Sequence, residues 1–104
     1  MEAPVALKVH DDDNVATIFS SGLTAGGEVK VLDKKGNAAE LTLISDLPFG
    51  HKAALCPINA GESIIKYGEQ IGVARKAIRR GEHVHIHNLD SMRGRGDLSR
   101  EETA

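Results

Sequence analysis

Aromatic side chains are scarce in this sequence of 104 residues, which contains one tyrosine, two phenylalanines and no tryptophan. A hydrophobic core must therefore consist of Val, Ile, Leu and Ala, whose side chains bury less surface than aromatic rings do. The sequence also lacks any apolar run near the roughly 20 residues that a membrane span needs. Its length suits one small domain and leaves no room for a second.

A surplus of positive charge is missing too. The 13 Lys and Arg residues are opposed by 15 Asp and Glu residues, so the formal net charge is -2. Nucleic-acid binders and polybasic membrane proteins both need a positive field. The charge therefore argues against a nucleic-acid partner and against a membrane partner.

Cysteine occurs once, at position 56, so no intramolecular disulfide can form. Together with the lack of a basic-then-apolar leader, this predicts a reducing, cytoplasmic location. Because Cys56 lies between Leu55 and Pro57 in an apolar segment, we expect it to be a buried packing residue rather than a ligand or a reactive thiol.

Motifs of self-sufficient enzymes are absent as well. The sequence has no glycine-rich phosphate loop, no nucleophile elbow and no dinucleotide fingerprint. If the chain takes part in catalysis, we expect it to supply only some of the groups.

Short alternating segments between glycine-bearing turns fill most of the chain and predict a mostly β fold. The stretches 26–33, 60–68 and 80–88 each place Gly-Glu directly before an alternating or apolar run. Glycine supplies the positive φ that such turns need. The pattern therefore predicts a compact domain of hairpin-like turns.

One or two short helices are expected within this fold. Residues 14–19 read as a short helix capped by Asp or Asn, with Asp11 to Asp13 at its N-terminus, and 69–78 as a strand with a helical end. Tyr67 is expected to be packed.

The end of the sequence, from residue 91 onward, is polar and interrupted by glycine. We therefore predict a domain over 1–90 and a tail over 91–104 that is flexible or bound to a partner. Arg93 and Arg95 in this tail can present guanidinium groups to carboxylates, sulfonates or an acidic partner. A solvated tail is the alternative.

The segment HVHIHN, at 83–88, alternates histidines with aliphatic residues. On a strand, His83, His85 and His87 would share one face. Adjacent members would have Cα atoms about 6.6 Å apart and the outer two about 13 Å, so one pair can bind a metal ion but all three cannot without a bulge. Solvated surface histidines are the alternative interpretation.

A metal held by such a pair needs a further ligand from elsewhere, and His51 and His10 are available. His51 and Lys52 follow a Pro-Phe-Gly turn that can present both side chains together. Lys52 can hold an anion or carry a proton, although a structural role remains open.

The segments DNVATIF, LPFGHKAAL, AGESIIKYGEQIG and RRGEHVHIHN, in this order, resemble the N-terminal domain of the altronate and D-galactarate dehydratase family over about residues 5–90. The resemblance implies a SAF domain with the β-clip fold, which also occurs in type III antifreeze protein and in the C-terminal part of sialic acid synthase. With its RGRGDL segment, the chain also looks like the small (alpha) subunits of the (2R)-3-sulfolactate sulfo-lyase family.

By this resemblance, the chain is part of a lyase and is inactive when isolated. It would eliminate sulfite from (2R)-3-sulfolactate to give pyruvate, together with a separate large subunit. A divalent metal, Fe2+, would be bound mainly with that subunit. The alternatives are a sugar-acid dehydratase that eliminates water and, in another class, a non-enzymatic module that binds sugar acids or metal. The chain could also associate with further copies of itself, and the sequence does not decide this.

The resemblance also implies roles for particular residues. The catalytic residues would be His51, His85 and Lys52, the metal ligands His85 and His87, and the substrate-binding residues Asn88, Arg93 and Arg95. His83, next to the turn, is expected to be solvated.

Overall fold

The computed structural model describes residues 4–91, which form nine short strands and no helix. The strands are β1 (Val5–Lys8), β2 (Val15–Ile18), β3 (Glu28–Asp33), β4 (Ala38–Thr42), β5 (Lys52–Ala54), β6 (Ser63–Lys66), β7 (Glu69–Ala74), β8 (His83–Val84) and β9 (Leu89–Ser91). The mostly β fold is confirmed, and within 4–91 there is no helix that could cross a membrane. The last strand includes Ser91, which the sequence had assigned to the tail; residues 92–104 lie outside the described part.

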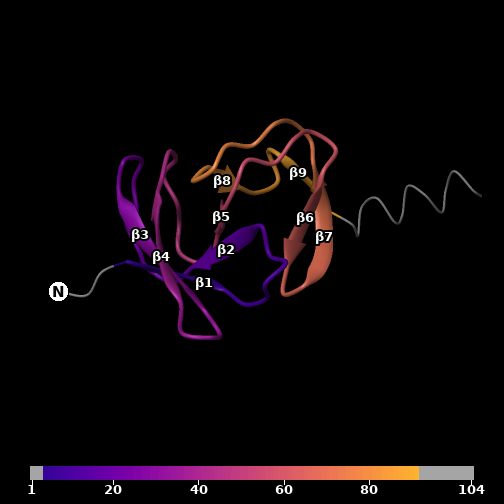
Figure 1. Ribbon diagram of the computed structural model, residues 1–104. Coiled ribbons are helices and arrows are strands. Elements are labelled where there is room, and N and C mark those ends of the chain that lie inside the picture. Colours follow the sequence, from indigo (N-terminus) through magenta and orange to yellow (C-terminus); the bar gives the residue numbers. More distant parts are fainter. Residues whose placement is uncertain (1–3, 92–104) are drawn as a thin grey trace, which may run out of the picture.

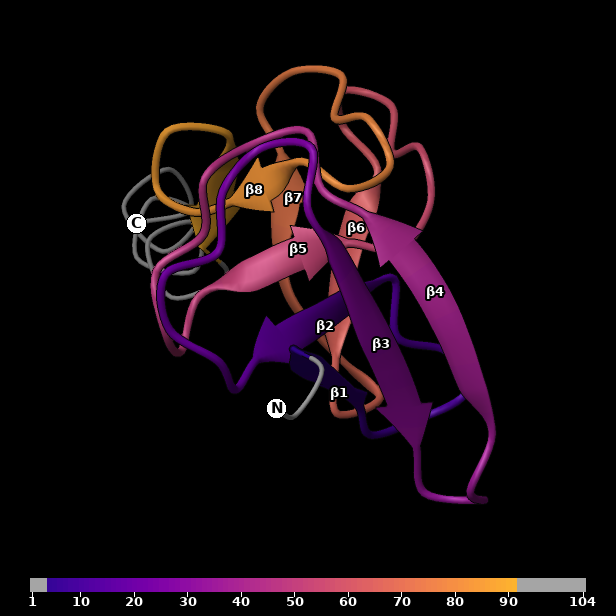
Figure 2. The ribbon, with the colours of Figure 1, turned by 90° about the vertical axis from the view of Figure 1, so that its left-hand side faces the viewer.

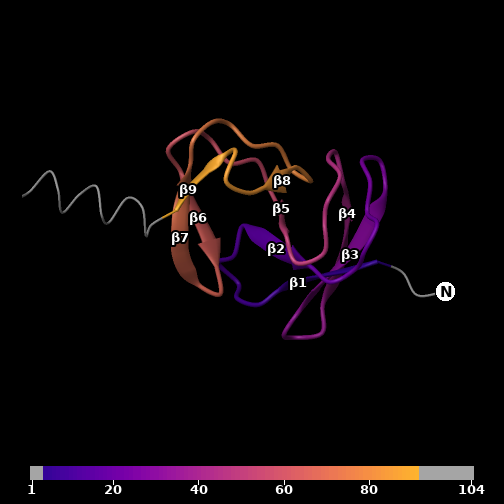
Figure 3. The ribbon, with the colours of Figure 1, turned by 180° about the vertical axis from the view of Figure 1, so that it is seen from behind.

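Two sheets build the domain. Six strands pair in the order β4-β3-β1-β2-β5-β8, and three pair in the order β6-β7-β9. All pairs are antiparallel except β1 and β3, which run parallel. The hairpin of β3 and β4 lies on one side of β1, β2 and β5, and the hairpin of β6 and β7 lies on the other (Figures 1 and 3).

The hydrophobic core consists of two clusters, neither of which contains an aromatic ring. In β2, Ala16 and Ile18 belong to the first cluster and Val15 to the second. In β5, Ala53 belongs to the first and Ala54 to the second. Successive side chains of these strands therefore point into opposite halves of the core.

This central position of β2 explains why the predicted helix at 14–19 is wrong. All four residues of β2 are buried, because the strand is covered on both faces. Its sequence therefore lacks the polar alternation by which a half-exposed strand is recognised. Asn14, the expected helix cap, instead binds β6: its Oδ1 accepts from the Ile65 amide at 2.8 Å and its Nδ2 donates to the Ser63 carbonyl at 2.8 Å. The predicted helical end of 69–78 is also absent, since β7 is followed by a bend and an isolated β-bridge.

Four turns of similar form close the loops. In each, the third residue is a glycine with φ between 83° and 90°, and the amide of the fourth residue donates to the carbonyl of the first. The four glycines are Gly26, Gly50, Gly61 and Gly81. Isolated β-bridges pair the residues just before these turns, Leu23 with Leu47 and Ile58 with Ile78. The predicted glycine turns, including the Pro-Phe-Gly turn at Gly50, are thus confirmed.

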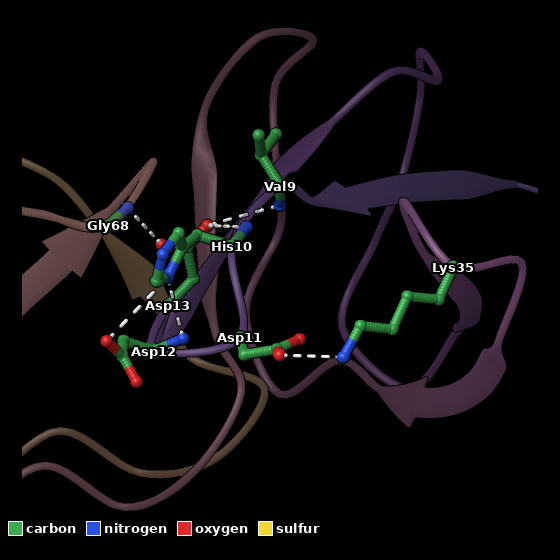
Figure 4. Close-up of polar contacts among 7 residues, drawn as sticks. All are labelled: Val9, His10, Asp11, Asp12, Asp13, Lys35 and Gly68. Carbon is green, nitrogen blue, oxygen red and sulfur yellow. Dashed lines mark hydrogen bonds and ion pairs between the residues drawn. The ribbon is translucent and has the colours of Figure 1, made fainter.

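The acidic run before β2 fixes a loop rather than a helix. Asp13 Oδ2 accepts from the amides of Val9 and His10, at 3.1 and 3.0 Å, and its Oδ1 accepts from the Gly68 amide at 2.8 Å. Asp11 pairs with Lys35 at 2.9 Å (Figure 4). The Asp13 carboxylate therefore joins the β1–β2 loop to the turn between β6 and β7.

Two residues expected to be buried are exposed instead. Cys56 is exposed in the bend that follows β5. Tyr67 is 52 % exposed because it and Gly68 form the tight β6–β7 turn, with φ of 56° and 76°, which directs its ring away from the core. The Lys66 ammonium lies 4.8 Å from the centre of that ring.

Candidate functional site

Three loop ends meet at one edge of the six-stranded sheet. The His51 carbonyl accepts from the Ile18 amide at 2.8 Å, so the start of β5 is held against the end of β2. β8 pairs antiparallel with β5, with Val84 opposite Lys52 and His83 opposite Ala53. The end of β2, the start of β5 and the segment after β8 consequently lie on the same side of the domain (Figure 2).

A cluster of histidines occupies this edge. His51 Nδ1 lies 2.8 Å from His83 Nε2, and the rings of His51 and His85 are stacked with their centroids 4.3 Å apart. One ring nitrogen from each of His51, His83 and His85 lies within 4.8 Å of the others. We call these three residues the histidine cluster.

The alternation expected for HVHIHN ends at Val84, because β8 is only two residues long and a turn follows it. Asn88 holds this turn: its Oδ1 accepts from the His85 amide at 3.0 Å and its Nδ2 donates to the His83 carbonyl at 2.9 Å. The turn leaves Ile86 73 % exposed instead of in the core. Next to this turn the rings of His83 and His85 are stacked, with their centroids 5.6 Å apart.

The structure thus groups the predicted residues differently from the sequence. His83, expected to be solvated, belongs to the cluster, whereas the exposed His87 lies outside it, with its ring centroid 5.2 Å from that of His83. Asn88 is fully buried, and its side-chain amide binds the backbone of His83 and His85, so it positions the histidines. Its contact with the substrate stays a prediction. The sequence did not predict that His83 joins the cluster, because this depends on how β8 pairs and where the turn after it begins. Asn88 is the residue in the sequence that signals this turn.

The remaining predicted residues lie in three places. Lys52 begins β5 and is half-buried next to His51. His10 is outside the cluster, where its Nδ1 accepts from the Asp12 amide at 3.1 Å. Arg93 and Arg95 lie outside the described residues.

The electrostatics keep two members of the cluster, His83 and His85, uncharged at neutral pH. Burial, followed by the neighbouring His51, His87, His85 and Lys52, lowers the pKa of His83 to about 4. Burial, then His51 and Lys52, also lowers the pKa of His85. The pKa of Lys52 is lowered by burial and by Lys66. Neutral imidazoles expose nitrogen lone pairs, the form in which histidine binds a metal.

The cluster fits a divalent metal ion in donor type. Nitrogens bound to one ion at about 2.1 Å can be at most about 4.2 Å apart, so the present spread requires only a small rotation of the rings. The hydrogen bond between His51 and His83 would then be replaced by contacts to the ion. Three imidazoles leave coordination positions open for a substrate or for ligands from another chain.

Comparison with known proteins identifies the domain. The profile described as "Altronate/galactarate dehydratase SAF domain" matches residues 4–92. The predicted SAF domain is thereby confirmed.

Similar proteins fall into two groups. The chain is 36 % identical over 88 residues to the (2R)-sulfolactate sulfo-lyase subunit alpha of Chromohalobacter salexigens, covering 82 % of this chain and 93 % of that protein. It is 47 % identical over 83 residues to the galactarate dehydratase (L-threo-forming) of Escherichia coli, and 43 % identical over 82 residues to the altronate dehydratase of the same organism. These matches cover 77 % and 79 % of this chain, but only 14 % and 15 % of the two dehydratases.

Proposed function

The chain belongs to the altronate/galactarate dehydratase SAF domain family, and from this we propose that it is the small subunit of a carbon–sulfur lyase. The proposed reaction eliminates sulfite from (2R)-3-sulfolactate and yields pyruvate. It requires a separate large subunit, and the isolated chain is inactive. We also propose a cytoplasmic location, which rests on the single cysteine.

The observation that carries this proposal is the histidine cluster, a three-imidazole group at an exposed edge with a lysine beside it. Such a group is suited to a small anionic substrate and a metal, yet it lacks most of what an elimination needs. A second chain facing this edge would supply the missing ligands and the remaining acid–base groups.

The chemistry asks for three things from the site. The proton at C2 of sulfolactate must be taken by a base, the C3–S bond must break with its electron pair leaving on sulfite, and the resulting enol then tautomerises to pyruvate. A bound divalent metal, proposed as Fe2+ held mainly with the large subunit, would polarise the carboxylate and α-hydroxyl and so stabilise the developing negative charge.

The chain's own residues take complementary roles in this scheme. His83 and His85, held neutral, offer lone pairs to the metal, and His51 either completes the ligand set or carries the proton. Lys52, whose charge acts on both His83 and His85, attracts the substrate anion. Arg93 and Arg95 remain predicted contacts to that anion or to the large subunit.

The choice of sulfite as the leaving group rests on the match to the sulfo-lyase subunit, of which this chain covers 93 %. The dehydratases are the second candidate, because their identity to this chain, at 47 % and 43 %, exceeds the 36 % of the Chromohalobacter salexigens subunit. Both reactions remove a proton next to a carboxylate and expel a β-substituent, so the same cluster would serve either of them.

The proposal is tested by co-expressing the full chain with its cognate large subunit and offering (2R)-sulfolactate, galactarate and altronate to the purified complex. We expect sulfite and pyruvate in equal amounts from sulfolactate with the complex and no turnover with either chain by itself. Dehydration of a sugar acid without sulfite release would instead assign the chain to the dehydratases.

A further inference from the structure

The aromatic residues of this domain lie outside its core. Phe19 is 46 % exposed and Phe49 is 59 % exposed, and their rings meet edge to face with centroids 6.1 Å apart. Exposed side chains of this size are characteristic of protein–protein interfaces, where phenylalanine is enriched. In a chain with two phenylalanines, their pairing on the surface calls for an explanation other than packing.

This pair borders the histidine cluster. Phe19 directly follows β2, and Phe49 lies two residues before His51. The amide of Gly50, the residue between Phe49 and His51, donates to the Ile18 carbonyl at 2.9 Å and so holds the two segments together. Ile86, which is 73 % exposed, lies in the turn that follows His85. We call Phe19, Phe49 and Ile86 the apolar rim.

We propose that the apolar rim is the surface on which the large subunit docks, so that its phenylalanine pair anchors the interface and the histidine cluster is enclosed beside it. This rests on the proposed function, because the large subunit exists only if the chain is part of such a lyase. The relatives from Chromohalobacter salexigens and Paracoccus pantotrophus are both named as subunits alpha, and a subunit has a partner.

The chemistry of the edge favours this occupant over others. A doubly anionic small substrate gains nothing from two exposed phenylalanines. A second copy of this chain would bring another Lys52 toward the first, whose positive charge already acts on His83 and His85. A larger partner that carries carboxylates would match both the charge and the open coordination positions of the cluster.

The dehydratases offer an independent indication. In the Escherichia coli enzymes the segment similar to this chain is 14 % and 15 % of a much longer polypeptide. Such a domain is held beside the remaining chain by covalent linkage. A separate subunit needs a surface with enough binding energy to replace that linkage, and buried aromatic anchors are the usual source.

The test compares Phe49→Asn and Phe19→Asn with Tyr67→Asn in the full chain, using affinity for the cognate large subunit as the readout. Tyr67 is a matched control because it is also an exposed aromatic residue, at 52 %, but it lies in the turn tied to the β1–β2 loop at the opposite end of β2. Asn is also well suited to the positive φ of that turn. Thermal unfolding of each variant checks that the domain remains folded.

We expect each Phe variant to bind the large subunit about tenfold or more weakly, as for an interface anchor, and Tyr67→Asn to bind as the unchanged chain does. Equal affinity for all three variants, or a self-association that Phe49→Asn abolishes, would overturn the proposed docking surface. The substrate panel is run on the same complexes. Sulfite release together with unaltered binding of the Phe variants would reject the docking surface and support the proposed function. Binding that depends on the Phe residues, in a complex without lyase activity, would support the docking surface and reject the proposed function.

Discussion

His51 and His83, 32 residues apart in the chain, share a hydrogen bond of 2.8 Å between Nδ1 and Nε2. One imidazole must donate and the other accept, so the bond is compatible with two neutral rings and is lost if both are protonated. The lowered pKa of His83, about 4, agrees with this. His83 is therefore uncharged at neutral pH and can take part in this bond as either donor or acceptor.

The grouping of His83 with His51 and His85 predicts which histidines matter for metal binding. His83→Ala should lower the metal affinity of the complex by at least about tenfold, the low end of what even indirect partners of a metal cost. His87→Ala should change it little, because His87 is exposed and outside the cluster. Metal content after dialysis against graded Fe2+ concentrations measures both, and the opposite ranking would favour the pair His85 and His87 that the resemblance implies.

The Asp13 carboxylate predicts an acid-sensitive contribution to stability. Burial opposes its ionisation, but the backbone donors of Gly68, His10, Tyr67 and Val9 outweigh it and lower its pKa. Asp13→Asn should therefore cost about 2 kcal/mol at neutral pH, since bonds to a charged acceptor are lost. Asp12→Asn, at a side chain that is 77 % exposed, is the control and should cost little.

The pH dependence of that difference follows from the sign of the shift. Because the pKa of Asp13 is lower in the folded state, its stabilisation is fully present above the ordinary value of about 3.9 and disappears as the pH falls through the folded value. Urea unfolding at pH 7 and at pH 3 should show a smaller gap between Asp13→Asn and the unchanged chain at the lower pH. A gap that does not narrow would contradict the assignment.

Gly61 and Gly81 make a matched pair for testing the turns. Both have φ of +86°, but a Cβ at Gly61 meets nothing within 4 Å, whereas one at Gly81 meets the Thr42 carbonyl oxygen at 2.2 Å. Gly61→Ala should cost about 1–2 kcal/mol through its backbone conformation alone. Gly81→Ala should cost at least about 1 kcal/mol more through overpacking, as measured by chemical unfolding. Equal losses would mean that the Thr42 segment moves freely.

Asn88 should act through the turn that it holds. Asn88→Ala leaves the His85 amide and the His83 carbonyl without their side-chain partner, which should destabilise the domain by about 3 kcal/mol. Asn37→Ala removes one exposed bond, from Asn37 Nδ2 to Asp33 Oδ2, and should cost less than about 1 kcal/mol. A direct substrate contact by Asn88 would instead raise KM and leave both stability and metal affinity unchanged.

The strands and turns of this domain were accessible from the sequence because alternation and glycine are local signals. The alternation rule failed at β2, where all four residues are buried between two core clusters and polar alternation is absent. Asp13 and Asn14 look like helix caps since the same side-chain geometry that caps a helix also binds loop amides. Their partners, Gly68 and Ile65, are more than 50 positions away, and only the folded topology brings them together.

The candidate site was predicted only in part, because it also depends on contacts between residues far apart in the sequence. The importance of His51 and His85 came from the resemblance, but the inclusion of His83 depends on where β8 ends, and two residues of strand are too short to recognise. Hydrophobicity would place Phe19 and Phe49 in the core. Their contact on the surface could not be predicted, because it depends on how the folded chain brings the two segments together.

β8 is a two-residue edge strand, and its pairing with β5 joins the two halves of the histidine cluster. So short a ladder can open without unfolding the rest of the domain, which makes it a local, low-energy event. A ligand bound across His51 and His83 would bridge that opening and slow hydrogen exchange at β8 far more than in the distant β3–β4 hairpin. The histidine cluster therefore has a structural role as well, because a ligand bound to it would stabilise the pairing of β8 with β5.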